Sequence, residues 1–184
     1  MNYPPFNDTL DEVVIIRLFM AKRITVRAPC RIDLAGGWTD VPNFCSKKSG
    51  EVVNIAINKY TKCIMDIDNQ RKISLSYSTD MPTGSGLGTS GSMNVGLIGT
   101  ILGAEYEATE IAEIAYQFEA LLGNKGGRQD QWASALGGIN HMSFKGENVE
   151  TKSLKPSIGF INLLEDRLLP VSYTHLTLPT KRIV

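Results

Sequence analysis

The segment from Pro82 to Ser92 is the part of this sequence best suited to binding a charged ligand. It reads PTGSGLGTSGS, with glycines at 84, 86 and 88 ahead of hydroxyl residues and a small-residue apolar run. Glycines let a backbone turn several N–H groups toward one anion, and a helix beginning here adds the positive end of its dipole. The expected phosphate-binding residues are Pro82, Gly84, Ser85, Gly86, Leu87, Gly88, Thr89 and Ser90. A glycine turn before a core helix is the alternative, since no Gly-Lys-Ser/Thr closes the loop.

Two further segments place an aspartate beside paired glycines. Residues 28–40 read APCRIDLAGGWTD, in which a strand runs into a glycine turn that displays Asp40. A carboxylate suits a polyol because it accepts hydrogen bonds from two neighbouring hydroxyls. Residues 126–138 read GGRQDQWASALGG, with Asp130 where a loop enters a helix. Taken singly, Asp40 is explained by a turn cap and Asp130 by a helix cap.

In this order, the three segments resemble the signature motifs of the GHMP kinases, the superfamily of galactokinase, homoserine kinase, mevalonate kinase and phosphomevalonate kinase. RIDLAGGWTD is similar to L-fucokinases, whereas GRQDQ and GGIN are similar to D-glycero-D-manno-heptose 7-phosphate kinases. The resemblance runs from about Arg27 to Phe144. It implies an α+β fold, the ribosomal-protein-like N-terminal domain of the GHMP kinases. It also implies that the chain is an N-terminal fragment without the family's C-terminal domain, and that this fragment alone is inactive.

The chemistry implied by the resemblance is Mg²⁺- and ATP-dependent phosphorylation of a sugar hydroxyl, with the anomeric position expected. Asp130 would accept the proton of the attacking hydroxyl or orient it, and Arg31 would stabilise charge beside it. The implied sugar-binding residues are Asp40, Gly37 and Trp38, and the implied Mg²⁺ ligands are Ser90 and Glu119. An exposed glutamate on an amphipathic helix is usually only solvated, so Glu119 carries that alternative. Trp132, Tyr116 and Met93 are expected in the core.

Regular elements are predicted from hydrophobic periodicity. Strands are predicted over 22–28, 51–57, 60–67, 72–78 and 138–144. Helices are predicted over 89–102, from Thr109 as N-cap to Gly123 as the stop, and over 129–136. Strands first and helices after favour an α+β layer over a doubly wound sheet.

Composition narrows the functional classes. The 184 residues are 42% hydrophobic and 21% charged, which is typical of a globular domain, and the formal net charge is zero. Zero net charge argues against an RNA-binding module or another nucleic-acid partner, and no apolar run is long enough for a membrane span. Cys30, Cys45 and Cys63 form no CxxC pair. We expect a reduced, cytoplasmic protein with a small-molecule sugar partner, and leave the oligomeric state open.

Three domain assignments follow. Residues 1–21 are expected to be an N-terminal extension, with Met20 as an alternative start, and 22–169 to be the kinase domain. Residues 170–184 are expected to be non-native, because Val171 to Thr180 resembles the translation of a transposon-end sequencing adapter. The resemblance also implies a deletion near 79–81, since relatives carry a longer segment, including a helix, before the glycine loop.

Two alternatives to a sugar kinase remain open. The chain would otherwise be a noncatalytic nucleotide- or sugar-binding fragment, or part of a GHMP kinase for another small alcohol. The sequence does not distinguish fucose from a heptose phosphate as the substrate.

Overall fold

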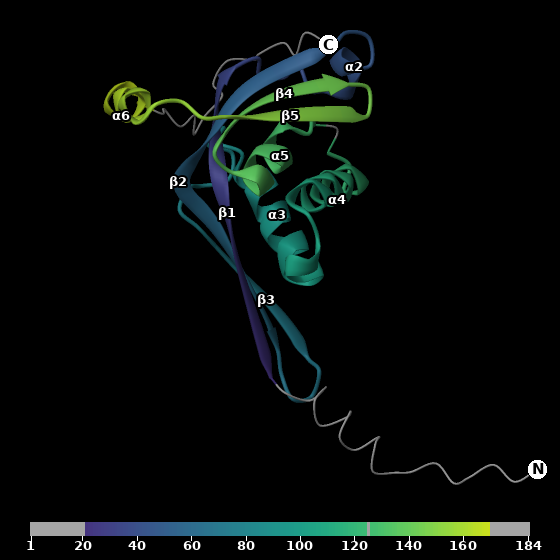
Figure 1. The fold of residues 1–184 in the computed structure, drawn as a ribbon. Helices are drawn as coiled ribbons and strands as arrows, with labels where there is room; N and C mark the ends of the chain where they lie inside the picture. The colour runs from purple at the N-terminus through teal and green to yellow at the C-terminus, as the bar shows by residue number, and fades with distance from the viewer. Residues whose placement is uncertain (1–20, 125, 170–184) are drawn as a thin grey trace, which may run out of the picture.

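An antiparallel sheet with α3, α4 and α5 against one face forms the described part of the chain, residues 21–124 and 126–169 of this computed structural model (Figure 1). The strands are β1 (Lys22–Ala35), β2 (Gly50–Ile67), β3 (Ile73–Thr79), β4 (Ile139–Lys145) and β5 (Asn148–Leu154). The helical elements are α2 (Pro42–Cys45), α3 (Thr89–Leu102), η1 (Gly103–Glu105), α4 (Ala108–Leu121), α5 (Gln129–Leu136) and α6 (Ile158–Arg167). The expected adapter-derived tail and nearly all of the expected N-terminal extension lie outside the described residues. The α+β expectation is confirmed.

The long strand β2 organises the sheet. β1 pairs along most of its length, β4 pairs with residues 50–55, and β3 pairs with residues 61–67, all antiparallel. The prediction of two strands, 51–57 and 60–67, was therefore wrong, because β2 continues through them. The pairing of β1 with β2 is nevertheless irregular near the expected break: between Pro29 and Arg31 the register shifts, with residues 57–59 of β2 opposite a single residue of β1, and it shifts again between Asp33 and Ala35. We call residues 22–27, 61–67 and 73–79 the arm, part of which packs against α3 and whose tip extends beyond the helices (Figure 1).

Small residues bring α3 close to the sheet. A Cβ on Gly96 would lie 3.2 Å from Cys63 Cβ, and one on Gly99 would lie 3.3 Å from Val26 Cγ1. Both distances are tighter than ordinary contact, so larger side chains would push the helix away. The predicted bounds of this helix, 89–102, are confirmed.

Two apolar clusters form the core. One joins α3 and α4 to β1 and contains Ala28, Val95, Ile98 and Ala115. The other contains Cys45, Val52, Ala112, Trp132, Ala133, Met142 and Phe144. The core position predicted for Trp132 is confirmed, with the residue 8% exposed, whereas Met93 and Tyr116 are only half-buried. The three cysteines are free and buried.

Several elements differ from the predictions. Helix α4 is capped by Glu107 rather than Thr109, because Glu107 and Glu110 form a reciprocal capping box. Strand β5, with the polar sequence NVETKSL, and helices α2 and α6 were not predicted. Within the described residues, no helix has the length and apolarity needed to cross a bilayer.

Candidate active site

The glycine loop ends on the N-terminus of α3. Gly84, Gly86 and Gly88 have φ values of 80°, 79° and 69°, a region that residues with a Cβ seldom occupy. Gly88 is the N-cap of α3 and contributes no side-chain cap. The first N–H groups of a helix have no acceptor within it, so this turn can donate to an anion. The loop thus has the geometry expected of a phosphate-binding loop, and phosphate binding itself stays a prediction.

The hydroxyl residues of the loop divide into structural and available groups. Ser85 and Thr89 are 3% and 2% exposed, and Thr89 Oγ1 donates to the Pro82 carbonyl oxygen at 3.3 Å. These side chains close the loop from within. Ser90 is exposed and lines the cleft beside the loop. Of the expected hydroxyl ligands, Ser90 is therefore the one best placed to reach a bound group.

Arg31 joins the glycine loop to α5. Its backbone N–H donates to Leu87 O at 3.0 Å, and its Nη1 donates to Gly86 O at 2.8 Å. Its Nε and Nη2 donate to Asp130 Oδ1 at 2.9 and 2.5 Å. Arg31 is only 7% exposed, so these contacts are sheltered from water. One buried guanidinium thus positions the loop and the candidate catalytic carboxylate together.

Asp130 lies on the first turn of α5, directly against α3. A Cβ on Gly91 would lie 2.7 Å from Asp130 Cβ, so only glycine permits this approach. The Asp130 side chain is 27% exposed and lines the cleft. Its Oδ1 takes both contacts from Arg31, and its Oδ2 makes no hydrogen bond to another described residue. The carboxylate is therefore an ion-paired group with one oxygen available, and helix capping does not account for it.

Asp40 holds the loop before α5. It is 1% exposed, and its Oδ2 accepts a hydrogen bond from Gln129 N at 2.8 Å. Burial raises the pKa of Asp40, although the hydrogen bond from Gln129 opposes the rise. A Cβ on Gly127 would lie only 1.8 Å from Asp40 Oδ2. Asp40 therefore holds the start of α5, which is distant in sequence, a role that differs from the turn cap considered for it, and its sugar-binding role stays a prediction.

The other two expected sugar-binding residues, Gly37 and Trp38, differ in their relation to the cleft. Trp38 is 73% exposed, has a φ of 69° and lines the cleft, so it is not a core residue. Gly37 is exposed but is not among the residues that line the cleft. Trp38 is thus the better placed of the two to contact a ligand.

Glu119 on α4 is held by amide side chains from other elements. Its carboxylate accepts from Asn94 on α3 at 3.0 Å, from Asn124 after α4, and from Gln131 on α5. The half-buried glutamate lines the cleft, so it is more than a solvated surface charge. Among the described residues, no three His, Cys, Asp or Glu side chains cluster as a metal site.

Asp33 belongs to the site but was missed by the sequence analysis. Its Oδ1 lies 3.4 Å from Arg31 Nε, and its Oδ2 accepts from Gln129 Nε2 at 3.1 Å. Burial raises the pKa of Asp33 to about 6, while Arg31 opposes the rise and Asp130 adds to it. Spacing offered a signal, because residues two apart on a strand share a face and Asp33 follows Arg31 by two. Gln129 and Gln131, which the motif contains, were missed as well.

These groups surround one open cleft of about 410 Å³, within the range of small-molecule sites. Its lining includes Arg31, Asp33, Trp38, Asp40, Gly84, Gly86, Gly88, Thr89, Ser90, Glu119, Gln129 and Asp130. Residues from three distant parts of the sequence therefore meet at one place, as the joint interpretation of the motifs required.

Comparison with known proteins identifies the fold. Residues 51–138 match the family model of the GHMP kinases N terminal domain. The chain is 30% identical over 213 residues to a Campylobacter jejuni protein described as D-glycero-alpha-D-manno-heptose 7-phosphate kinase, covering 88% of this chain and 62% of that protein. It is 26% identical over 216 residues to the Arabidopsis thaliana bifunctional fucokinase/GDP-fucose pyrophosphorylase, covering 84% of this chain and 20% of that protein.

Solved structures agree with this identification. A D-glycero-D-manno-heptose 1-phosphate kinase from Bacteroides thetaiotaomicron matches with a TM-score of 0.69 and 25% identity, over 79% of this chain and 63% of that one. A putative sugar kinase from Campylobacter jejuni matches with a TM-score of 0.64 and 29% identity, over 78% of this chain and 60% of that one. The chain contains a GHMP kinase N-terminal domain, and it spans less than two thirds of the length of these relatives.

Proposed function

We propose that this chain forms the nucleotide- and sugar-binding lobe of an ATP-dependent kinase that phosphorylates a sugar hydroxyl, with the anomeric hydroxyl expected. The observation that carries the proposal is the contact of Arg31 with both Asp130 and the glycine loop. It supports the proposal because Asp130, whose Oδ2 has no hydrogen-bond partner among the described residues, is joined by Arg31 to a loop whose helix N-terminus could hold an anion. The similarity to proteins described as heptose-phosphate kinases and fucokinases supports the substrate class.

The residues at the loop fit a nucleoside triphosphate. A Cβ on Gly84 or Gly86 would meet nothing within 4 Å, so the space above the loop is open for phosphate oxygens. Ser90 would contact the phosphates or the Mg²⁺ ion, and Glu119 would approach the ion from α4. Mg²⁺ keeps several waters and phosphate oxygens as ligands, so it needs few protein groups. Bound Mg·ATP would supply the phosphoryl group and a cation that offsets its charge.

Asp130 and Arg31 would act on the acceptor. Asp130 Oδ2 would accept the hydrogen bond of the attacking hydroxyl, orienting it toward the phosphates and receiving its proton. Arg31 would keep that carboxylate in place and lend positive charge where charge develops. Positioning and charge stabilisation supply most catalysis of phosphoryl transfer. A base of this kind contributes roughly 10²–10⁴-fold to the rate.

The sugar would lie at the other end of the cleft. Trp38 offers an exposed aromatic face for the C–H surface of a sugar ring, and Asp33 and Asp40 line the adjacent wall. These groups suit fucose and a heptose phosphate equally. A second alcohol class remains an alternative, because a Thermococcus sibiricus mevalonate kinase is 27% identical over half of this chain.

We further propose that this chain lacks a segment between β3 and the glycine loop. The alignments with the Campylobacter and Arabidopsis proteins run over 213 and 216 residues, more than the 184 of the whole chain. Those relatives therefore contain residues with no counterpart here. The link from Thr79 to Pro82 is the expected place, since β3 is exposed throughout beside it. A cytoplasmic location and the absence of nucleic-acid or membrane partners also stay predictions.

The test is sugar phosphorylation by the full-length parent of this chain and by its Asp130→Asn variant. Each would be incubated with Mg·ATP and with L-fucose or a heptose 7-phosphate, and sugar phosphate measured by ³¹P NMR. We expect the unaltered protein to form sugar phosphate and the Asp130→Asn variant to lose this activity. The affinity of the variant for ATP should be unchanged, because its glycine loop is intact. Product at the unaltered rate from Asp130→Asn would refute the mechanism. ATP binding without product from either sugar would favour the noncatalytic nucleotide- or sugar-binding alternative.

A further inference from the structure

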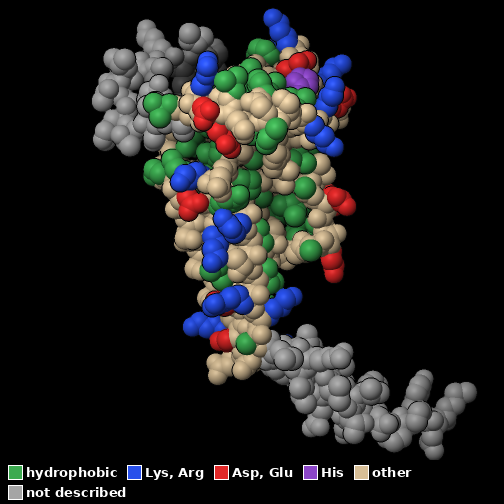
Figure 2. All heavy atoms as spheres, turned by 60° about the vertical axis from the view of Figure 1, so that its left-hand side comes forward, with side chains coloured by type: hydrophobic (Ala, Val, Ile, Leu, Met, Phe, Trp, Pro, Cys, Tyr) green, Lys and Arg blue, Asp and Glu red, His purple; other side chains and the backbone are tan. Residues whose placement is uncertain are grey.

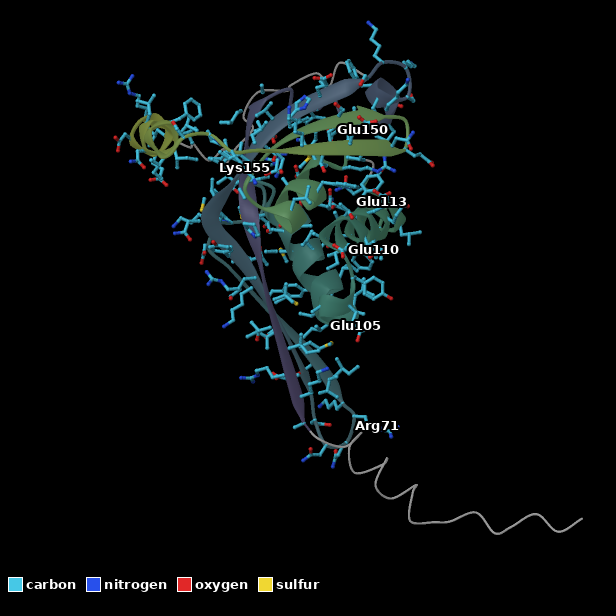
Figure 3. All side chains as sticks on the ribbon, in the orientation of Figure 1. Arg71, Glu105, Glu110, Glu113, Glu150 and Lys155 are labelled. Carbon is cyan, nitrogen blue, oxygen red and sulfur yellow. The ribbon has the colours of Figure 1, made fainter. Side chains whose placement is uncertain are left out.

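The outer edge of β3 is a surface that the proposed active site does not use. All seven residues from Ile73 to Thr79 are exposed, and within the described residues β3 pairs only with β2. The strand runs along the arm, whose tip lies beyond the helices and is marked by Arg71 (Figures 1 and 3). An edge strand with unpaired backbone groups is a template for another strand.

One face of β3 is apolar. Ile73, Leu75 and Tyr77 are 59%, 45% and 40% exposed and alternate along the strand. Tyr77 pairs with Cys63 and Leu75 pairs with Met65, both buried residues of β2. Cross-strand partners share a face, so this apolar strip lies on the same side of the sheet as α3.

The usual protections of an edge strand are missing from β3. Its sequence, ISLSYST, has no charge and no proline, and its pairing with β2 has no bulge. Basic side chains do run along the arm (Figure 2), but Arg23, Arg27 and Lys62 belong to β1 and β2. The outer edge is therefore open to strand addition.

We propose that β3 pairs antiparallel with β3 of a second copy of this chain, with Ser76 opposite Ser76. This is the register that pairs all seven residues, and it keeps the apolar faces of both copies on the same side. Leu75 of each copy then lies opposite Tyr77 of the other. Lys72 lies opposite Asp80 at both ends of the paired strands, so the charges flanking this uncharged strand are complementary.

The pairing joins two sheets into one and extends the apolar strip across both copies. Seven paired residues make a small interface, so the dimer is weak and its population depends on concentration.

A lysine introduced at two different sites on one row of the sheet distinguishes the loss of strand pairing from a general effect of added charge. Ser76 and Thr25 both pair with Ile64, Ser76 on the outer strand β3 and Thr25 on β1.

Sedimentation velocity over roughly 1–300 µM chain, the range for weak association, tests the proposal. We expect the weight-average mass to rise from one chain toward two. Ser76→Lys places two ammonium groups opposite each other and should keep the chain monomeric at every concentration. Thr25→Lys adds the same charge to the same row and should leave the dimer intact. A monomer throughout, or a dimer unaffected by Ser76→Lys, would overturn the proposal.

Hydrogen exchange of the β3 amides distinguishes a second copy from a cover supplied by the chain itself. Protection that increases with concentration, and that Ser76→Lys removes, supports the dimer. Protection that is already present in dilute solution and does not change with concentration would mean that another part of the same chain occupies the edge, and would overturn the proposal.

Discussion

Replacing Asp33 by asparagine should change how the stability of this domain depends on pH. Asp33 is partly buried beside Arg31, with its side chain 19% exposed, and its pKa in the folded chain is raised to about 6 from an ordinary 3.8. A raised carboxyl pKa means that the folded state holds a proton that the unfolded state has released. The free energy of unfolding contributed by this group is therefore highest at low pH and decreases as pH rises from about 4 to about 6.

The size of the effect follows from the shift. One pKa unit corresponds to about 1.4 kcal/mol. A rise of about two units therefore means that ionised Asp33 lowers the free energy of unfolding by at most about 3 kcal/mol above pH 6. Asparagine cannot ionise and is nearly isosteric. Gln129 Oε1 is buried without a hydrogen-bond partner, so a turned Gln129 side chain can accept from the new amide. The variant should therefore gain stability relative to the parent chain as pH rises.

Urea unfolding followed by the fluorescence of buried Trp132, between about pH 4 and pH 7, measures the difference. We expect the variant to gain up to about 3 kcal/mol over the parent chain across this interval. Asp66→Asn is the control, because the hydrogen bond from Arg23 lowers the pKa of this exposed carboxyl, so its removal should give no gain in stability as pH rises. If the free energy of unfolding varies with pH in the same way for Asp33→Asn and for the parent chain, the claim that burial raises the pKa of Asp33 is refuted.

Two further predictions concern the walls of the cleft. Gly127→Ala should lower the free energy of unfolding by about 1–3 kcal/mol, because its Cβ would overlap the buried Asp40 carboxylate. Gly126→Ala is the control in the same urea titration. It should be tolerated, because its Cβ would meet nothing closer than 3.5 Å. Thr89→Ala should cost about 1 kcal/mol by removing a buried hydrogen bond that closes the loop. Ser90→Ala should leave stability unchanged and weaken Mg·ATP binding in a calorimetric titration; equal effects of the two substitutions on stability would contradict their assigned roles.

The sequence predicted those elements whose pattern is local. Helix α3 has the predicted bounds because its loop and its small-residue run both lie within one segment. Strand β5 escaped prediction because its stability comes from pairing with β4, and its own residues are polar. The cap of α4 was misplaced by two residues because Glu107 and Glu110 compete with Thr109 through a reciprocal pair of hydrogen bonds.

The site shows the same division. The order of the motifs predicted that Asp130, Arg31 and the glycine loop act together, and the structure has all three lining one cleft. The burial of Asp40 and the three amides around Glu119 depend on how α3, α4 and α5 meet, so no single motif contains them. Asp33 could have been found, because strand periodicity places it on the face of Arg31.

Mg·ATP binding measured by titration calorimetry on a matched pair of Gly84 variants is the most direct test of the central claim. Gly84 has a φ of 80° and open space above it, and both aspartate and asparagine tolerate that backbone conformation. Gly84→Asp would place a carboxylate among the phosphates and should weaken binding at least about tenfold, whereas Gly84→Asn should bind nearly as the parent chain does. If the parent chain binds no Mg·ATP, or if all three proteins bind it equally, the glycine loop is not the phosphate site.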